Sequence, residues 1–323
     1  MAGHRILFDM VRGAAVGLPK GNWSSLIVLK AKQLPHGMIG LPEPLPFESP
    51  ASWVTRAALS QGETVVAFLA HLDLPDVRDF DLAITSGAGR RVLAHCGVSK
   101  QFSFAVNVFG RLKGLGTIGP SLLLTTREGW PRSRFCPRCL ATRRESCFEI
   151  HCRFIPWRFC PLHHCLLEDA CPHCRRPVVL PFDMVCAGIK KSGVAYLSKC
   201  QWCEGALVAA KAVALHDLPL SEWDWMLLKN GRATLAALRQ GVVRIDNQAE
   251  KPLSNLKRLA RMGALPMRAD HLTADGARQA LATQASIDSG PRYQREGPYI
   301  LLNDSKSFSP SGVAWKPKHE RSS

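Results

Sequence analysis

The sequence predicts a mainly helical protein whose central segment is built from small metal-binding modules with short β elements. Two observations predict this fold class. Pairs of Cys and His residues with two-residue spacing crowd the centre of the chain, and amphipathic segments with helix-capping residues lie on both sides of it. The chain has 323 residues, enough for two or three small domains, and no apolar run approaches the ~18 residues of a membrane helix. We therefore expect no membrane association and a cytoplasmic protein.

Residues 1–40 have no strong periodicity, and we treat them as an N-terminal extension without an assigned role. The next segment, 41–126, reads as a helical module. Ser49 and Pro50 are typical of a helix N-terminus, and they predict a helix over 51–60 that ends before Gly62. A second helix over 64–72 follows. Two short helices around a glycine turn favour a helix-turn-helix-like module.

A second helix pair is expected directly after the first. We predict helices over 90–96 and 100–109, joined by a turn at Gly97, with Ser99 as the N-cap of the second helix. In a helix-turn-helix the residues Ser99, Lys100 and Gln101 would begin the recognition helix and reach base edges. The alternative is an ordinary helical hairpin, which is the commoner structure.

The cysteines of the central segment, 127–205, predict two zinc sites. Each Cys/His pair leaves two residues between its members, so that one tight turn directs two ligands at one metal ion, and zinc takes four such ligands. The predicted ligands are Cys136, Cys139, Cys160 and His163 for the first ion and Cys171, Cys174, Cys200 and Cys203 for the second.

Both zinc sites are expected to be structural, because all four ligand positions are filled by protein. An interleaved pairing, as in a cross-braced ubiquitin-ligase finger, remains an alternative. Disulfides are not expected, because the chain is long and lacks an export signal. The cysteines outside the pairs are interpreted as buried or incidental thiols: Cys96, Cys147, Cys152, Cys165 and Cys186.

Charge points to a polyanionic partner. The chain carries 42 Lys and Arg against 26 Asp and Glu, a net charge of +16, and all basic residues of segment 127–176 are arginines. We expect these arginines to face outward and contact DNA phosphates. The candidates are Arg132, Arg134, Arg138, Arg143 and Arg144.

The segment 206–288 reads as a C-terminal helical region. Ser221 predicts the start of one long helix, a basic amphipathic helix is expected over 253–262, and Thr273 predicts the start of a last helix ending near residue 282. Residues 289–323 are polar and contain scattered Pro and Gly, so a flexible tail is expected. No phosphate-binding G-x-x-x-x-G-K-[ST] loop occurs in the sequence.

Two separate motifs carry a resemblance to a known family. The first is Pro42-x-Pro44-x-Pro46-x-Glu48-Ser49-x-x-Ser52-Trp53-x-x-Arg56 with Gly62 downstream. The second is the run of Cys-Pro-x-Cys-Leu, Trp157-Arg158, Cys-Pro-x-His and Cys-Pro-x-Cys. Together they resemble the TniQ family over residues 41–205, about half of the chain.

The resemblance implies an accessory protein of DNA transposition that selects the target site or recruits the machinery to it. Family members work with an AAA+ ATPase regulator and a DDE transposase, and some dock on an RNA-guided CRISPR effector. They do not cut or join DNA, so no catalytic residues are expected. The C-terminal region here is shorter than the target-reading extensions of TnsD-type proteins, which favours an adaptor role over independent site reading.

Other functions remain open from sequence. The chain could be a pure protein adaptor, a zinc-finger or helix-turn-helix transcription regulator or, least favoured, an enzyme that uses cysteine or zinc chemistry. The sequence leaves the oligomeric state open, and a homo-oligomer is compatible with it.

Overall fold

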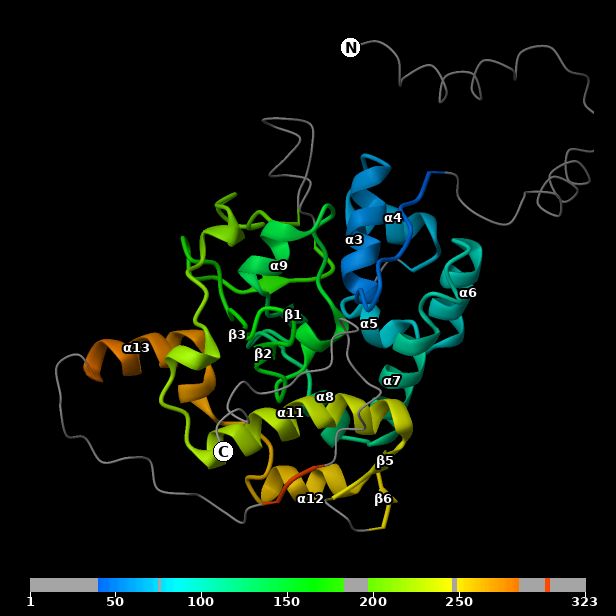
Figure 1. Cartoon of the computed structure of the whole chain (residues 1–323). Coiled ribbons are helices and arrows are strands. Elements are labelled where there is room, and N and C mark those ends of the chain that lie inside the picture. The colour runs from blue at the N-terminus through cyan, green and yellow to red at the C-terminus, as the bar shows by residue number, and fades with distance from the viewer. Residues whose placement is uncertain (1–39, 75–76, 183–196, 246–248, 285–299, 303–323) are drawn as a thin grey trace, which may run out of the picture. The chain divides into compact units, whose positions relative to one another are not determined.

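The computed structural model describes residues 40–74, 77–182, 197–245, 249–284 and 300–302, all within one compact unit (Figure 1). The N-terminal extension up to residue 39, Cys186, and the tail from 289 apart from 300–302 lie outside the described residues. The described part is mainly helical and contains three two-stranded antiparallel sheets. It holds no helix that is both long and apolar enough to cross a membrane.

The elements follow one another along the chain with short connections. The α-helices are α3 (Pro50–Ser60), α4 (Val65–His71), α5 (Phe80–Ala83), α6 (Gly87–His95), α7 (Ser103–Gly114), α8 (Ile118–Ser121), α9 (Pro137–Thr142), α11 (Glu222–Gln240), α12 (Asn255–Arg261) and α13 (Ala274–Gln284). The strands are β1 (Arg132–Ser133), β2 (Phe159–Cys160), β3 (Cys165–Leu166), β4 (Val178–Val179), β5 (Val242–Val243) and β6 (Lys251–Pro252). Short 3₁₀ helices η2 (Ile150–Arg153), η3 (Leu207–Ala209), η4 (Leu215–Asp217) and η5 (Asp270–Leu272) complete the described part.

The first helices begin where their capping residues predict. The Ser49 hydroxyl accepts the Ser52 amide at 3.0 Å, with Pro50 in the first turn, and α3 buries Trp53 completely. Thr64 caps α4 in the same way, accepting the amide of Ala67 at 3.1 Å. Both helices of the first predicted pair are thus confirmed.

The second pair differs from its prediction at the turn. α7 begins at Ser103, and Phe102 occupies its N-cap without a side-chain hydrogen bond. The prediction that Ser99 caps this helix is wrong, because residues 99–102 form a turn that precedes it. Burial of Phe102, 2% exposed and edge-on to Trp53, accounts for the later start, since the turn carries this ring into the core.

The two central sheets join segments of the metal-binding region. β2 and β3 form a hairpin in which Cys160 pairs with Cys165. β1 pairs with β4 in the register Arg132 to Val179, which brings the two halves of segment 127–205 together. Each strand has two residues, so these sheets hold loops in place and form no extended surface.

Helix α11 is the longest described element and packs against α7 (Figure 1). It begins with a capping box in which Ser221 and Asp224 each bond the other's backbone amide. It ends at Gly241, whose φ of 85° is the left-handed geometry that glycine adopts without strain. Gly231 lies at the middle of α11, where a Cβ would be 1.9 Å from the carbonyl oxygen of Pro156. Glycine is therefore required there by the contact with the metal-binding region.

The hydrophobic core runs across the predicted segment boundaries. One cluster includes Trp53 and Phe102 of the N-terminal helices, Phe154 and Trp157 of the central region, and Leu238 of α11. A second cluster lies between the β2–β3 hairpin and the C-terminal helices. The metal-binding region is thus packed on both sides by helices.

Candidate metal centres and the surrounding surface

The first predicted ligand set comes together in the fold. The ligand atoms of Cys136, Cys139, Cys160 and His163 all lie within 4.8 Å of one another. The Cys139 and Cys160 sulfurs are 3.5 Å apart, and the Nδ1 atom of His163 is 3.3–3.6 Å from the three sulfurs. Sulfur atoms bound tetrahedrally to one ion at about 2.3 Å lie about 3.8 Å apart, so this set fits a metal ion.

The second set converges in the same way. The ligand atoms of Cys171, Cys174, Cys200 and Cys203 lie within 4.8 Å of one another, with sulfur pairs at 3.6 and 3.7 Å. The sequential partition is therefore the one the fold adopts, and the interleaved alternative is excluded. No disulfide occurs among the described cysteines. Two Cys/His clusters could thus each hold a metal ion.

The two centres differ in exposure. Each cluster has two buried cysteines, Cys136 and Cys160 in the first and Cys171 and Cys200 in the second, and the other two ligands of the first cluster are half-buried. Cys203 is exposed. An ion in the second cluster would be the more accessible to a chelator.

Backbone geometry shapes each turn around its ligands. The amides of Cys139 and His163 point at the Cys136 and Cys160 sulfurs at 3.4 Å, and in the second cluster Trp202 donates to Cys200 at the same distance. Amide donors beside a sulfur stabilise its thiolate form, which is the form that binds metal. The residues that follow three of the pairs have left-handed backbones: His164, Arg175 and Glu204. Their amides bond the carbonyl of the first cysteine of the pair and close the turn.

A fourth sulfur, from outside the ligand set, lies beside the first centre. Cys165 is fully buried and its sulfur is 3.6 Å from that of Cys136. Its place follows from the β2–β3 hairpin, because residues paired directly across an antiparallel ladder, here Cys160 and Cys165, lie on one face. The sequence gives Cys165 no pair partner, so only the hairpin register reveals it. Cys96, Cys147 and Cys152 are buried, as expected for incidental thiols.

The Glu48-Ser-x-x-Ser-Trp-x-x-Arg56 motif forms a buried network that reaches the metal-binding region. Arg56 binds both oxygens of Glu48, at 2.9 and 2.7 Å, and Ser52 donates to the same carboxylate at 2.8 Å. The Ser52 hydroxyl then accepts the amide of Phe148 at 3.0 Å, and Arg56 also pairs with Glu145. The motif thus joins α3 to the loop after α9.

Several central arginines point inward, contrary to the expectation that they face outward. Arg134 is 2% exposed and donates to Asp169 at 2.9 Å and to three backbone carbonyls. Arg153 is fully buried, with Asp81 at 2.9 Å and Asp79 at 2.7 Å. Burial of a guanidinium requires such partners, and here they come from α5 and its N-cap.

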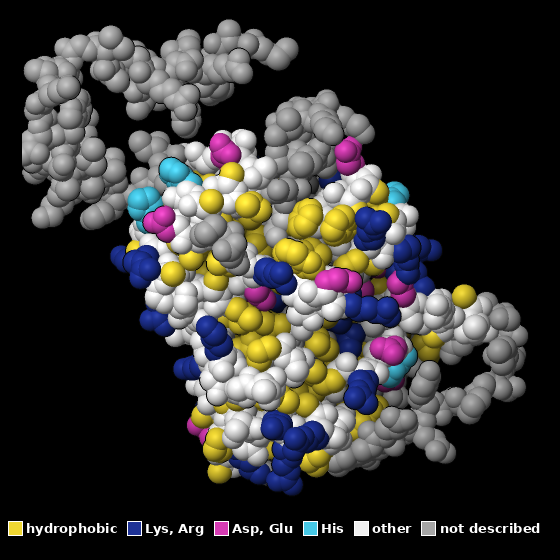
Figure 2. All heavy atoms as spheres, turned by 180° about the vertical axis from the view of Figure 1, so that it is seen from behind, with side chains coloured by type: hydrophobic (Ala, Val, Ile, Leu, Met, Phe, Trp, Pro, Cys, Tyr) yellow, Lys and Arg dark blue, Asp and Glu magenta, His cyan; other side chains and the backbone are white. Residues whose placement is uncertain are grey.

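The remaining predicted DNA contacts occupy two separate surfaces. Arg138 and Arg144 are exposed on and after α9. Arg143 is half-buried, pairs with Glu149 and donates to the Cys147 sulfur. The second surface is the turn before α7, where Ser99, Lys100 and Gln101 are exposed. Figure 2 shows Lys and Arg side chains over one face of the protein, more numerous there than acidic ones.

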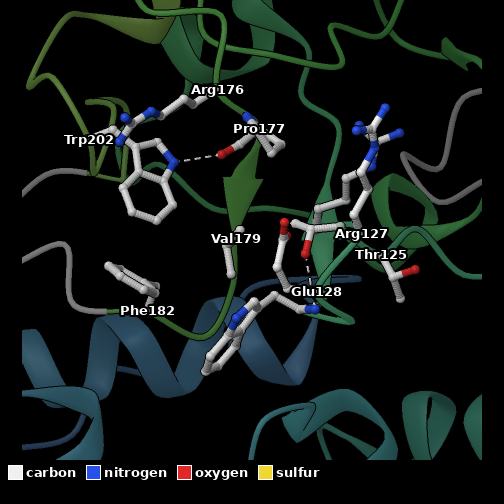
Figure 3. A pocket seen from close by; sticks show the side chains of 11 residues that line it. Thr125, Arg127, Glu128, Arg176, Pro177, Val179, Phe182 and Trp202 are labelled. Carbon is white, nitrogen blue, oxygen red and sulfur yellow. Dashed lines mark hydrogen bonds between the residues drawn. The ribbon is translucent and has the colours of Figure 1, made fainter.

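A hollow of about 690 Å³ opens beside the second metal centre, and we call it the tryptophan pocket. Two exposed rings, Trp130 and Trp202, line it. The other lining residues are Thr125, Thr126, Arg127, Glu128, Arg132, Arg176, Pro177, Val179 and Phe182. Figure 3 shows Trp202 and Phe182 on one side of strand β4 and Arg127 and Glu128 on the other. Of these residues, only Arg132 was predicted as a binding residue from sequence.

Comparisons of the chain with models of protein families and with curated proteins found no match.

Proposed function

We propose that this chain is a TniQ-like accessory protein of DNA transposition, which recruits an AAA+ ATPase regulator and a DDE transposase to target DNA on a zinc-stabilised scaffold. One observation carries the proposal. The Glu48–Arg56 motif and the tandem Cys/His pairs, which resemble the family independently, are physically joined, because Arg56 and Ser52 bond Glu145 and Phe148. Two motifs that build one interface are expected to serve one function.

Zinc is the proposed metal in both clusters. A closed set of three thiolates and one imidazole, or of four thiolates, with sulfur spacings of 3.5–3.7 Å suits a tetrahedral structural zinc. The ion would tie together loops whose strands have only two residues each, and it leaves no position for a water molecule or a substrate. We therefore assign it a role in folding.

Direct DNA contact is proposed for the exposed basic residues. Arg138 and Arg144 are exposed and take no part in the buried networks described above. Of the five arginines that the sequence predicts as phosphate contacts, these two are the best placed to reach DNA. Lys100, in the turn between α6 and α7, would contribute from a helix-turn-helix-like arrangement. Such contacts make affinity salt-dependent.

The side-chain chemistry favours recruitment over catalysis. Burial raises the pKa of Cys147 to about 11, with the Glu48 charge acting in the same direction and Arg143 opposing it, so this thiol is not an activated nucleophile. Ser221, Asp224 and His271 lie together, but the carboxylate is between the serine and the imidazole. A serine nucleophile needs the imidazole in the middle. This trio therefore caps α11.

The recruitment proposal is tested with the full, zinc-loaded chain. The genes beside the coding sequence are expected to encode an AAA+ ATPase and a DDE transposase. The tagged chain should capture that ATPase from a nuclease-treated mixture of purified proteins, and omission of the chain should abolish targeted insertion in a reconstituted reaction. Insertion of equal frequency and distribution without the chain would overturn the proposal.

Duplex DNA binding is tested separately, by anisotropy as a function of salt. The double variant Arg138→Gln and Arg144→Gln should lower the magnitude of the log–log salt slope by about 1.8, since each lost phosphate contact is worth about 0.9. An unchanged slope in the double variant would assign the duplex contacts to other residues. If the duplex affinity of the wild-type chain does not depend on salt while ATPase capture persists, the chain is a protein adaptor that docks on the ATPase or on an RNA-guided effector without reading DNA.

A further inference from the structure

We propose that the tryptophan pocket binds an unpaired segment of nucleic acid, with bases stacked on Trp130 and Trp202 and phosphates held by Arg127, Arg132 and Arg176. The inference shares the nucleic-acid partner of the proposed function, but it names a different form of that partner and a different surface. Its test therefore can fail while the proposed function stands.

The Trp202 ring is exposed and yet held in a fixed orientation. Trp202 is 39% exposed, its indole Nε1 donates to the Pro177 carbonyl at 2.9 Å, and its amide donates to the Cys200 sulfur. Phe182 packs on it with ring centroids 5.1 Å apart. A ring fixed before binding loses little conformational freedom when a base stacks on it.

Trp130 is presented by a tight hairpin. The Thr126 amide donates to the Trp130 carbonyl at 2.8 Å, the Thr126 hydroxyl accepts the Trp130 amide at 3.2 Å, and Gly129 has a φ of 80°. The hairpin holds the ring 38% exposed at its end, while its backbone bonds do not involve the indole. Removal of this indole therefore should leave the hairpin intact.

Charge around the rings selects an anionic ligand. The guanidinium of Arg176 lies 5.4 Å from the centre of the Trp202 ring, and that of Arg78 lies 5.2 Å from the Trp130 ring. Each guanidinium lies over the ring itself, so a stacking base has to displace it, and the displaced cation is then available to the phosphate of that nucleotide. Among the described residues that line the pocket, Glu128 is the one acidic residue, against three arginines.

Arg132 supplies a cation that the fold leaves poorly compensated. Its Nε is buried and has no hydrogen-bond partner, and its nearest carboxylate oxygen, on Asp169, is 3.5 Å away. Burial lowers the pKa of Arg132, and the charge of Arg134 acts the same way while Asp169 opposes it. A phosphate at the pocket would provide the missing counter-charge.

The geometry favours an unpaired strand over a duplex. Base faces inside a duplex are covered by their neighbours, and duplex DNA offers proteins only base edges and phosphates. Single strands present free faces, and aromatic stacking with flanking cations is how proteins hold them. The pocket volume of about 690 Å³ is within the range of about 300–1,000 Å³ that ligand sites occupy.

The test uses the full, zinc-loaded chain and fluorescein-labelled oligo(dT), oligo(U) and a DNA duplex, each of about 12 nucleotides per strand. The proposal expects tighter binding of either single strand than of the duplex. Trp130→Ala should weaken single-strand binding about tenfold, while Trp130→Phe retains most of it because the phenyl ring still stacks. The ratio of oligo(dT) to oligo(U) affinity then distinguishes DNA from RNA.

Matched variants separate the pocket from general basicity. Arg176→Gln should lower the magnitude of the salt slope for oligo(dT) by about 0.7, the value of one phosphate contact on a single strand. Arg91→Gln, an exposed arginine of α6 outside the pocket, should leave that slope unchanged. Circular dichroism and melting of Trp130→Ala confirm the fold.

The proposal is overturned if folded Trp130→Ala binds oligo(dT) as wild type does, or if the duplex binds at least as tightly as both single strands. Competition by an uncharged proline-rich peptide, with no single-strand binding, would assign the pocket to a protein partner instead. Duplex affinity unchanged in Trp130→Ala leaves the proposed recruitment function intact whichever result is obtained.

Discussion

At the scale of single residues, the most consequential finding is that arginines of the central region divide into buried and exposed groups. Arg153 is fully buried, and its guanidinium bonds Asp79, Asp81 and the Leu124 carbonyl of the N-terminal module as well as the Arg132 carbonyl of the central region. Arg138, in the same region, is exposed. The sequence alone does not distinguish these two arginines. Their environments show that Arg153 contributes to stability and that Arg138 is available at the surface.

Arg153→Ala is expected to destabilise the protein by about 3–5 kcal/mol, because it leaves the fully buried Asp81 without its cation. The matched control Arg138→Ala removes an exposed arginine and should change the unfolding free energy by less than about 0.5 kcal/mol. Urea unfolding with excess zinc measures both. Equal effects of the two substitutions would contradict the assignment of Arg153 to the core.

Acid sensitivity is expected at the start of α11. Burial acts to raise the pKa of Asp224, but hydrogen bonds from His271 and Ser221 outweigh it, and the pKa is lowered. The unfolded chain then binds this proton more readily than the native protein does. The resulting stability is complete above the ordinary Asp pKa of about 3.9 and is lost as the pH falls through the lower native value.

Asp224→Asn should therefore cost about 1 kcal/mol at pH 7 and flatten the loss of stability below about pH 4. The control is Glu222→Gln, an exposed carboxylate in the same helical turn. Urea midpoints between pH 3 and pH 7 report the result. A pH profile of Asp224→Asn parallel to that of the wild type would refute the role of this carboxylate.

At the scale of elements, α11 shows how a local rule gives way to packing. Glycine inside a helix costs up to about 1 kcal/mol relative to alanine, so Gly231 looks like a defect. The close approach of Pro156, however, leaves no room for a Cβ. The helix keeps its weakest residue at the point where it touches the metal-binding region.

Gly231→Ala should consequently destabilise the protein by 2 kcal/mol or more, roughly the range for overpacking, although it raises helix propensity. Gly110 provides the matched control, because it is within α7 and a Cβ there meets nothing within 4 Å. Gly110→Ala should stabilise by up to about 1 kcal/mol. Thermal melts of the two variants should shift in opposite directions, and a shift of Gly231→Ala to higher temperature would disprove the steric contact.

Local signals in the sequence predicted the elements that depend on neighbours in the chain. Ser49, Thr64 and Ser221 each bond a residue three positions away, and the members of each metal-ligand pair have the same spacing. The start of α7 could not be predicted in this way, because it depends on the packing of Phe102 against Trp53, far away in the sequence. Tertiary burial outweighed the capping preference of Ser99.

The same distinction applies to the candidate sites. Both metal clusters could be predicted because their ligands come in pairs whose spacing is visible in the sequence. The tryptophan pocket could not, since Trp130 and Trp202 are 72 positions apart and come to one pocket through the pairing of β1 with β4 and the convergence of the second Cys cluster. The inward arginines were missed for the same reason, as Asp81 precedes Arg153 by 72 positions.

At the scale of the whole described unit, metal and core are expected to act together. Purified native protein should contain two equivalents of zinc, and loss of the first ion should melt the helices as well, because Cys136 and Cys160 belong to the same core as Trp53. Cys139→Ser should likewise be unfolded or unstable. A cooperatively melting, metal-free protein would disprove this coupling.

Chelation should remove the two ions at different rates. The ion held by the second cluster should leave first, because its ligand Cys203 is exposed, whereas every ligand of the first cluster is buried or half-buried. A zinc-sensitive dye in the presence of EDTA measures the release, and Cys203→Ser should eliminate the fast phase. Release in one phase would show that the clusters do not differ in accessibility.

The salt bridges of Arg153 and the Glu48–Arg56 network have a consequence for how such a chain can change over time. If residues 41–126 were separated from 127–205, Asp81 would lose its ion pair with Arg153, and each residue would be left unpaired on a different fragment. Both fragments would also expose apolar surface that the shared core buries. We therefore expect selection against gene rearrangements that place either segment in a protein without the other. Segments 41–126 and 127–205 should accordingly occur together in related proteins, and substitutions in one should be matched by substitutions in the other.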